Sequence, residues 1–226
     1  VLCGCKVKKW TAGDLISALV PGGGYAEYVK LPARNFLKLP TNLDWRTHPA
    51  EVGVITDAIA TPVKVIRHAN VKPGETVAVF GAGGGLGIHM LMLAKWAHAK
   101  VIAIDVAENK FDACRSAGAD ICVNLAGGHA KEVLKDLSNG GVDVAIDFVS
   151  SQETLEAAVQ CLGRGGRMVT LGGSGVSFRA NAAEMLAKEL VLMGSRYATR
   201  QEVIKSLELC ARGDVWPLVT ETTDMA

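Results

Sequence analysis

Residues 76–87 read TVAVFGAGGGLG, and the order of side chains in this stretch decides the expected fold. Residues 77–80 are all apolar, which is typical of a strand buried on both faces of a parallel sheet. Five glycines follow within seven residues, and residues 86–97 then have the length and apolar character of a helix. A buried strand, a glycine turn and a helix in this order predict the first unit of an α/β fold.

The alternation of strand and helix continues towards the end of the chain. We predict strands at residues 76–80, 100–105, 121–124, 142–149, 167–171 and 190–194. We predict helices at residues 86–97, 108–117, 130–137, 151–162, 181–187 and 199–212. Strands joined by crossover helices predict a doubly wound, parallel, six-stranded Rossmann sheet.

The first fifty residues follow a different, irregular pattern. We expect a turn at residues 21–24, a short strand at 25–31 and an extended piece at 36–39. Helical spacing over residues 51–69 then leads into the sheet, with Pro62 as a kink or boundary. The sequence therefore predicts a partial β-rich domain at 1–50 and a Rossmann domain with a linking helix at 51–226.

Composition excludes several classes of function. The 226 residues carry 24 basic and 23 acidic side chains, a net charge of +1, which argues against nucleic acid or an anionic membrane as the main partner. The longest apolar stretches are too short to span a bilayer. Six scattered cysteines, mostly in apolar contexts, indicate free thiols in a reducing cytoplasm rather than a disulfide scaffold.

The glycine turn has the chemistry of a pyrophosphate-binding site. A tight turn from strand to helix needs positive φ angles, and a diphosphate must approach bare N–H groups at a helix N-terminus. We therefore predict that the dinucleotide binds to Gly81, Gly83, Gly84, Gly85, Leu86 and Gly87. The alternative is a glycine turn that binds no ligand.

Asp105 ends the second predicted strand, 24 residues after Gly81 (105 − 81), where a ribose-binding carboxylate belongs. Such a carboxylate accepts hydrogen bonds from the ribose hydroxyls and repels a 2′-phosphate, which favours NAD over NADP. Lys110 is a candidate contact to the ribose or the adenine edge, with a solvated helix lysine as the alternative.

Two further strand ends are expected at the same edge of the sheet, because ligands of open parallel sheets lie over the carboxyl ends of strands. Phe148 and Val149 follow one strand and are candidates for lining the cofactor site, although Phe148 also fits a plain core position. Gly172 and Gly173 follow the next strand and would let a flat ring approach the backbone.

Several stretches together resemble the medium-chain dehydrogenase/reductase superfamily, specifically its zinc-dependent alcohol dehydrogenases. They are residues 24–29 (GYAEYV), 56–62 (TDAIATP), 79–87, 101–105, 117–120 (AGAD) and 142–149. They follow the order of the family and span nearly the whole chain. The resemblance implies that residues 1–50 are the end of a GroES-like catalytic domain, and that the segment returning to that domain is missing.

The resemblance also implies a catalytic zinc. In a secondary-alcohol branch of the family the third zinc ligand is an aspartate within a Thr-Asp-Ala-Gly-Leu-Thr segment. Residues 56–61, TDAIAT, match that segment with Ile59 in place of glycine, so we carry the ligand role onto Asp57 alone. The alternative is an aspartate that caps the following helix. The other two ligands have no counterpart in this sequence.

Many relatives carry a second, structural zinc held by four closely spaced cysteines. Only Cys3 and Cys5 remain of that pattern here, and two thiols cannot close a tetrahedral site. We therefore expect no structural zinc in this chain.

The implied function is NAD-dependent hydride transfer between an alcohol and a ketone or aldehyde, with this chain mainly the coenzyme-binding part. We expect the chain alone to bind NAD(H) and to oxidise alcohols weakly or not at all. The resemblance further implies a homodimer or homotetramer, with the last strand as a contact edge. The alternatives are a zinc-free quinone or enoyl reductase of the same superfamily and a non-catalytic NAD-binding module.

Overall fold

The computed structural model describes residues 7–20, 22–125, 136, 140–173 and 175–223. The chain divides into two compact units, one of residues 1–60 and 198–226 and the other of residues 61–197. This division differs from the expected one, which placed residues 51–226 in a single domain. The predicted helix at 130–137 lies almost wholly outside the described residues.

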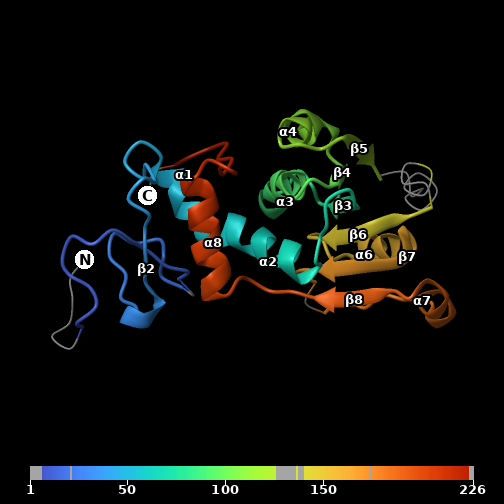
Figure 1. The fold of residues 1–226 in the computed structure, drawn as a ribbon, viewed down its shortest axis with the longest axis horizontal. Helices are drawn as coiled ribbons and strands as arrows, with labels where there is room; N and C mark the ends of the chain where they lie inside the picture. Colours follow the sequence, from blue (N-terminus) through green and yellow to red (C-terminus); the bar gives the residue numbers. More distant parts are fainter. Residues whose placement is uncertain (1–6, 21, 126–135, 137–139, 174, 224–226) are drawn as a thin grey trace. The chain divides into compact units, whose positions relative to one another are not determined.

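The larger unit is built on the predicted parallel sheet, which confirms the Rossmann fold. Its six strands lie in the order β5-β4-β3-β6-β7-β8, and every neighbouring pair is parallel (Figure 1). Their bounds are β3 Thr76–Phe80, β4 Lys100–Asp105, β5 Ile121–Asn124, β6 Val142–Asp147, β7 Leu162–Thr170 and β8 Val191–Gly194. The chain order reverses between β3 and β6, so these two neighbouring strands mark the switch point of the sheet.

Helices follow most strands close to where the apolar periodicity predicts them. They are α3 Gly85–Trp96, the short η3 Glu108–Lys110 with α4 Phe111–Ser116, α6 Gln152–Gln160 and α7 Ala182–Lys188, whereas α2, Ala60–His68, precedes β3. The last helix, α8 Arg200–Ala211, lies in the other unit. None of the described helices has both the length and the apolar character required to cross a lipid bilayer.

Both faces of the sheet are buried, as the unbroken apolar strands predict. Val77 and Val79 of β3 belong to a buried cluster that also contains residues of α2 and α3. Ala78 and Phe80, which point to the opposite face, belong to a second cluster with residues of α6. Because all four side chains are at most 1% exposed, β3 is held between two layers of helices.

The helical segment before the sheet contains an irregular turn. It begins as α1, Pro49–Val54, continues as a π-helix, Ile55–Ile59, and passes directly into α2. The N–H of Ala60 donates to the carbonyl of Ile55, five residues earlier. Pro62 cannot supply a helical N–H, and the widened turn precedes it, so the irregularity lies one turn earlier than the predicted kink.

The smaller unit combines both ends of the chain. Strands β1 Ile16–Ser17 and β2 Leu37–Lys38 pair antiparallel, and a short 3-10 turn, η1 Ala33–Asn35, precedes β2. The guanidinium of Arg200 on α8 donates to the carbonyls of Arg34 and Phe36 at 2.9 and 3.0 Å. These bonds between residues distant in sequence explain why α8 groups with the N-terminal segment.

The strand predicted at residues 25–31 is wrong. These residues form bends and irregular backbone, and no described strand pairs with them. Tyr25 is 98% exposed and Tyr28 is 82% exposed. An alternating pattern forms a strand only where a neighbour completes its hydrogen bonds, and the described residues provide none here.

At the amino ends of the strands, Arg167 of β7 joins three segments of the larger unit. Its Nη2 lies 2.6 Å from Oε2 of Glu75, and its Nε donates to the carbonyl of Ala69 at 2.7 Å. The two charged side chains are only 20% and 16% exposed, so removal of one leaves its partner poorly solvated.

We expect Arg167→Met to lower the free energy of unfolding by about 2 kcal/mol, because it leaves the Glu75 carboxylate and the Ala69 carbonyl without this partner. Denaturant unfolding would measure the change. Arg164→Met is the matched control, since Arg164 is exposed on the same strand. Equal losses in both variants would contradict the expectation.

Candidate functional site

Among the cavities formed by the described residues of the larger unit, two hold candidate polar groups. The first has a volume of about 380 Å³ and lies where β3, β4 and β6 end. The residues that line it are Gly81, Gly84, Gly85, Leu86, Gly87, Asp105, Lys110, Phe148 and Val149. All nine are among the predicted cofactor-binding residues. These nine come from four separate parts of the chain.

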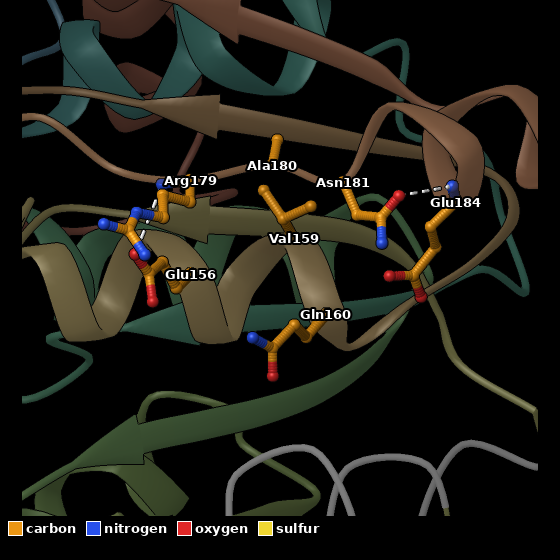
Figure 2. Close-up of a pocket in the computed structure, with 7 residues that line it drawn as sticks. All are labelled: Glu156, Val159, Gln160, Arg179, Ala180, Asn181 and Glu184. Atoms are coloured by element: carbon orange, nitrogen blue, oxygen red, sulfur yellow. Dashed lines mark hydrogen bonds between the residues drawn. The ribbon is translucent and has the colours of Figure 1, made fainter.

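The second cavity, of about 400 Å³, lies between α6 and the segment that leads into α7 (Figure 2). Its carboxylates already have partners within the protein. Oε1 of Glu156 accepts from the backbone N–H of Arg179 at 3.2 Å, and Glu184 lies 2.8 Å from the ammonium of Lys188. The described contacts thus satisfy its acidic groups internally, whereas the first cavity lies at the switch point of the sheet. We take the first as the candidate site.

The glycine turn is held against the neighbouring strand by its backbone. The N–H groups of Gly81 and Ala82 both donate to the carbonyl of Ile104 on β4, at 2.9 and 3.1 Å. Helix α3 then begins at Gly85 with Gly84 as its N-cap, and no side chain caps it. The first-turn N–H groups of a helix lack intrahelical partners and carry the positive end of its dipole. Here that end borders the cavity, so the turn is suited to bind an anionic group.

Gly83 and Gly87 have no room for a side chain. A Cβ on Gly87 would overlap the carbonyl oxygen of Gly81, because α3 starts directly against the turn. A Cβ on Gly83 would lie 2.8 Å from Cβ of Lys110 and 3.1 Å from Oδ2 of Asp105. Gly83 therefore does not line the cavity itself but lies against two residues that do.

Asp105 is oriented by the backbone around it. Its Oδ2 accepts from the N–H of Gly83 at 2.8 Å and its Oδ1 accepts from the N–H of Ala107 at 3.0 Å. A carboxylate has about four acceptor positions, so each oxygen can accept a further hydrogen bond from a ligand. The carboxylate thus lies at the cavity in a fixed orientation with capacity to bind hydroxyl groups.

The wall opposite the glycine turn comes from the end of β6. Val149 is 51% exposed and lines the cavity together with Phe148. Behind them, Asp147 is fully buried and accepts from the backbone N–H groups of Val149 and Ser150 at 2.8 and 3.0 Å. Burial raises the pKa of Asp147, while these hydrogen bonds act in the opposite direction. Asp147 was not among the predicted site residues; its signal in the sequence was an acidic residue directly after the apolar run at residues 144–146.

Gly172 and Gly173 lie outside this cavity. They follow β7 at the same edge of the sheet, and a Cβ on Gly173 would lie 2.8 Å from Cβ of Ser150. The structure therefore places them next to the turn that follows β6, and not among the residues lining the candidate site.

Asp57 lies in the other unit, exposed, in the π-helix. It stands inside a continuous helical segment, which is not an N-cap position, so the capping alternative does not hold. Within the described ranges, no group of three or more His, Cys, Asp or Glu side chains is arranged to hold a metal ion. Cys3 and Cys5 lie outside the described residues.

His89 is buried beneath the glycine turn, 2% exposed on α3. Its Nδ1 lies 2.5 Å from the carbonyl oxygen of Gly85, one of the residues lining the cavity. Burial lowers the pKa of His89 below 6.5, and this effect is larger than the opposing effect of the hydrogen bond. Burial therefore favours the neutral form of the imidazole that lies against the first turn of α3.

Comparison with known proteins shows that this chain is similar to dehydrogenases. The family described as zinc-binding dehydrogenase matches residues 85–212. An alcohol dehydrogenase of Geobacillus stearothermophilus is 35% identical over 205 residues, which cover 90% of this chain and 58% of that protein. An NAD-dependent alcohol dehydrogenase of Sulfurisphaera tokodaii is 31% identical over 203 residues, which cover 88% and 57%.

The fold agrees with a solved structure of the same kind. The alcohol dehydrogenase of Aeropyrum pernix superimposes with a TM-score of 0.78 at 32% identity, over 86% of this chain and 56% of that one. The chain thus spans less than two thirds of the length of these three relatives.

The buried His89 predicts a dependence of stability on pH. An unfolded histidine takes up a proton as the pH falls through 6.5, whereas the folded one resists protonation until a lower pH. Stability contributed by the neutral form is therefore present above pH 6.5 and declines as the pH falls towards the folded pKa.

We expect the melting temperature to fall more steeply between neutral and mildly acidic pH in the wild type than in His89→Gln. Differential scanning calorimetry over that range would measure both slopes. His98→Gln is the control on a histidine outside the helix. Parallel slopes for the wild type and His89→Gln would contradict the assignment.

Proposed function

The chain belongs to the zinc-binding dehydrogenase family of the medium-chain dehydrogenase/reductase superfamily, and we propose that it is the coenzyme-binding part of an NAD-dependent alcohol dehydrogenase. One observation carries the proposal. The N-terminus of α3, the Asp105 carboxylate and the end of β6 border a single cavity at the switch point of the sheet. That arrangement supports binding of a dinucleotide with its diphosphate at the helix N-terminus.

Each end of the proposed site has a separate task. The N–H groups of the turn that contains Gly84–Gly87 bind the diphosphate, and Asp105 binds the ribose hydroxyls with Lys110 beside it. Phe148 and Val149 close the opposite side and exclude water. Gly172 and Gly173, at the neighbouring strand end, would lie towards the nicotinamide half. When bound, NAD⁺ supplies the ring that accepts a hydride from the substrate carbon.

The proposed preference for NAD rests on the charge of Asp105. Because its carboxylate is held by Gly83 and Ala107, it cannot turn away from a 2′-phosphate without losing those bonds. A relative described as NAD-dependent is similar over most of this chain, which supports the same preference.

Zinc enters the proposal only through Asp57, which we propose as one ligand of a catalytic zinc in the whole protein. A catalytic zinc needs three protein ligands, and the residues at hand in the described structure do not form such a group around Asp57. We therefore derive no catalytic step through the metal, and we expect the chain by itself to bind NAD(H) with little or no alcohol oxidation.

The proposed partners follow from the same family membership. The substrate is a small alcohol or carbonyl compound, and the proposed assembly is a homodimer or homotetramer. Strand β8 is an edge of the sheet with Val191 45% exposed, which supports pairing with a second copy. The free, buried thiols of Cys114, Cys161 and Cys210 support the cytoplasm as the location.

The coenzyme preference can be measured directly by calorimetric titration with NADH and NADPH. We expect the wild type to bind NADH at least about tenfold more tightly than NADPH, because Asp105 repels the 2′-phosphate. In Asp105→Asn we expect the ratio to fall to about threefold or less.

Asp112→Asn is the matched control, because Asp112 is 98% exposed on α4 and does not line the cavity. It should leave the ratio unchanged. A wild-type preference for NADPH would overturn the NAD assignment and favour a zinc-free reductase of the same superfamily.

A further inference from the structure

Asp147 is a carboxylate at a buried position, where a negative charge is energetically unfavourable. It ends β6 and has no exposed surface, with Phe80 and Thr170 as its neighbours on the adjoining strands. A buried carboxylate is tolerated only when its oxygens accept hydrogen bonds. The identity of its donors therefore indicates which part of the protein the charge organises.

All of its described donors come from the segment that immediately follows β6. Oδ1 accepts from the backbone N–H groups of Val149 and Ser150, at 2.8 and 3.0 Å. Oδ2 accepts from the hydroxyl of Thr154 at 2.9 Å. Thr154 in turn exchanges hydrogen bonds with Ser151 in the capping box that begins α6. One side chain thus joins the end of β6, the turn after it and the start of the next helix.

The turn after β6 has a backbone conformation that is unfavourable for a residue with a side chain. Ser150 has a φ of +55°, in the left-handed region that a side chain disfavours by about 1 kcal/mol or more. Its hydroxyl lies 2.9 Å from the hydroxyl of Thr170 and donates to the carbonyl of Leu171 at 3.2 Å. Asp147 holds the N–H groups on the other side of the same residue, and together these contacts offset the strain.

The conformation of this turn sets the width of the cavity. Val149 Cγ2 lies only 2.8 Å from the position that a Cβ on Gly81 would occupy. Val149 and Phe148 also form the wall that faces the glycine turn. A relaxation of the backbone at residues 149 and 150 would therefore move this wall relative to the N-terminus of α3.

We infer that Asp147 is a positioning residue for the dinucleotide, which holds Phe148 and Val149 against the glycine turn without touching the ligand. The inference rests on the proposed function, because it takes NAD(H) as the ligand of this cavity. A purely structural role would affect stability alone, whereas a positioning role also affects affinity and is rescued by a side chain of the same shape.

The test compares substitutions at two carboxylates of the same strand. Asp147→Ala removes the acceptor for two buried N–H groups, and we expect it to weaken NADH binding at least about tenfold in calorimetric titration. Asp147→Asn keeps one carbonyl oxygen for those N–H groups and an amide for the Thr154 hydroxyl, so we expect binding within about threefold of the wild type.

Asp143→Ala is the matched control. Oδ2 of Asp143 accepts from the backbone N–H of Thr76 at 2.8 Å, which is the same kind of bond at the amino end of β6. We expect this variant to lose stability and to keep its NADH affinity within about twofold. If Asp147→Ala binds NADH as tightly as Asp143→Ala, or if Asp147→Asn loses as much affinity as Asp147→Ala, the inference is wrong.

Amide hydrogen exchange of the free protein separates this inference from the proposed function. The amides of Val149 and Ser150 should exchange slowly in the wild type, in Asp147→Asn and in Asp143→Ala, and at least about tenfold faster in Asp147→Ala. If the wild type fails to bind NADH, the proposed function is wrong, and the exchange rates of these two amides still test whether Asp147 holds the turn. Unchanged exchange of both amides in Asp147→Ala would overturn the inference about Asp147.

A second pair of variants applies if Asp147→Ala does not fold. Thr154→Val removes the hydroxyl that donates to Asp147, whereas Thr154→Ser keeps it. We expect Thr154→Val to weaken NADH binding about threefold and to speed exchange at Ser150, and Thr154→Ser to do neither. Equal behaviour of the two variants would overturn the inference.

Discussion

The contact between the start of α3 and the end of β3 is the constraint on which the larger unit depends. Gly87 stands so close to the carbonyl of Gly81 that no side chain fits between them. This closeness lets α3 pack on the sheet through Ile88 and Leu91 and leaves its first N–H groups at the cavity. In the same turn, the N–H of Gly83 donates to Oδ2 of Asp105 at 2.8 Å. The glycine turn thus contacts the helix, the sheet and the proposed ribose-binding carboxylate.

Two strands of the sheet end in an aspartate whose carboxylate accepts from backbone N–H groups, and the proposed roles of these two aspartates differ. Asp105 ends β4 and Asp147 ends β6, and each carboxylate accepts hydrogen bonds from two backbone N–H groups. Asp105 borders the cavity and keeps acceptor positions for a ligand. Asp147 has no exposed surface and, among the described residues, accepts only from the turn after β6 and from the Thr154 hydroxyl at the start of α6. Burial, and not the type of side chain, separates the proposed binding role from the proposed positioning role.

The structure differs from expectation at three places in the smaller unit and its connecting helix. The strand predicted at residues 25–31 lacks a pairing partner among the described residues, and a strand cannot form from its own alternation. Helix α8 was assigned to the sheet by its position in the chain, but Arg200 and Asn42 bond it to the N-terminal segment. Pro62 was predicted as a kink or boundary, whereas the irregular backbone is a π-helical turn before it, from which the helix continues. The first two outcomes depend on contacts with residues distant in sequence, and the third depends on a local hydrogen bond from Ala60 to Ile55.

The linear pattern of residues was enough to predict the Rossmann sheet, the glycine turn and Asp105, because apolar runs, glycines and a strand-end carboxylate act over a few neighbouring residues. The same pattern correctly predicted Phe148 and Val149 at the edge of the sheet where the strands have their carboxyl ends, since parallel strands bring those ends together. Three features were visible only in the folded protein: Gly83 lies against Asp105 and Lys110 instead of lining the cavity, Gly172 and Gly173 lie outside it, and Asp147 is buried. These facts depend on distances between separate strands and on exclusion of water, which a linear pattern of residues does not contain.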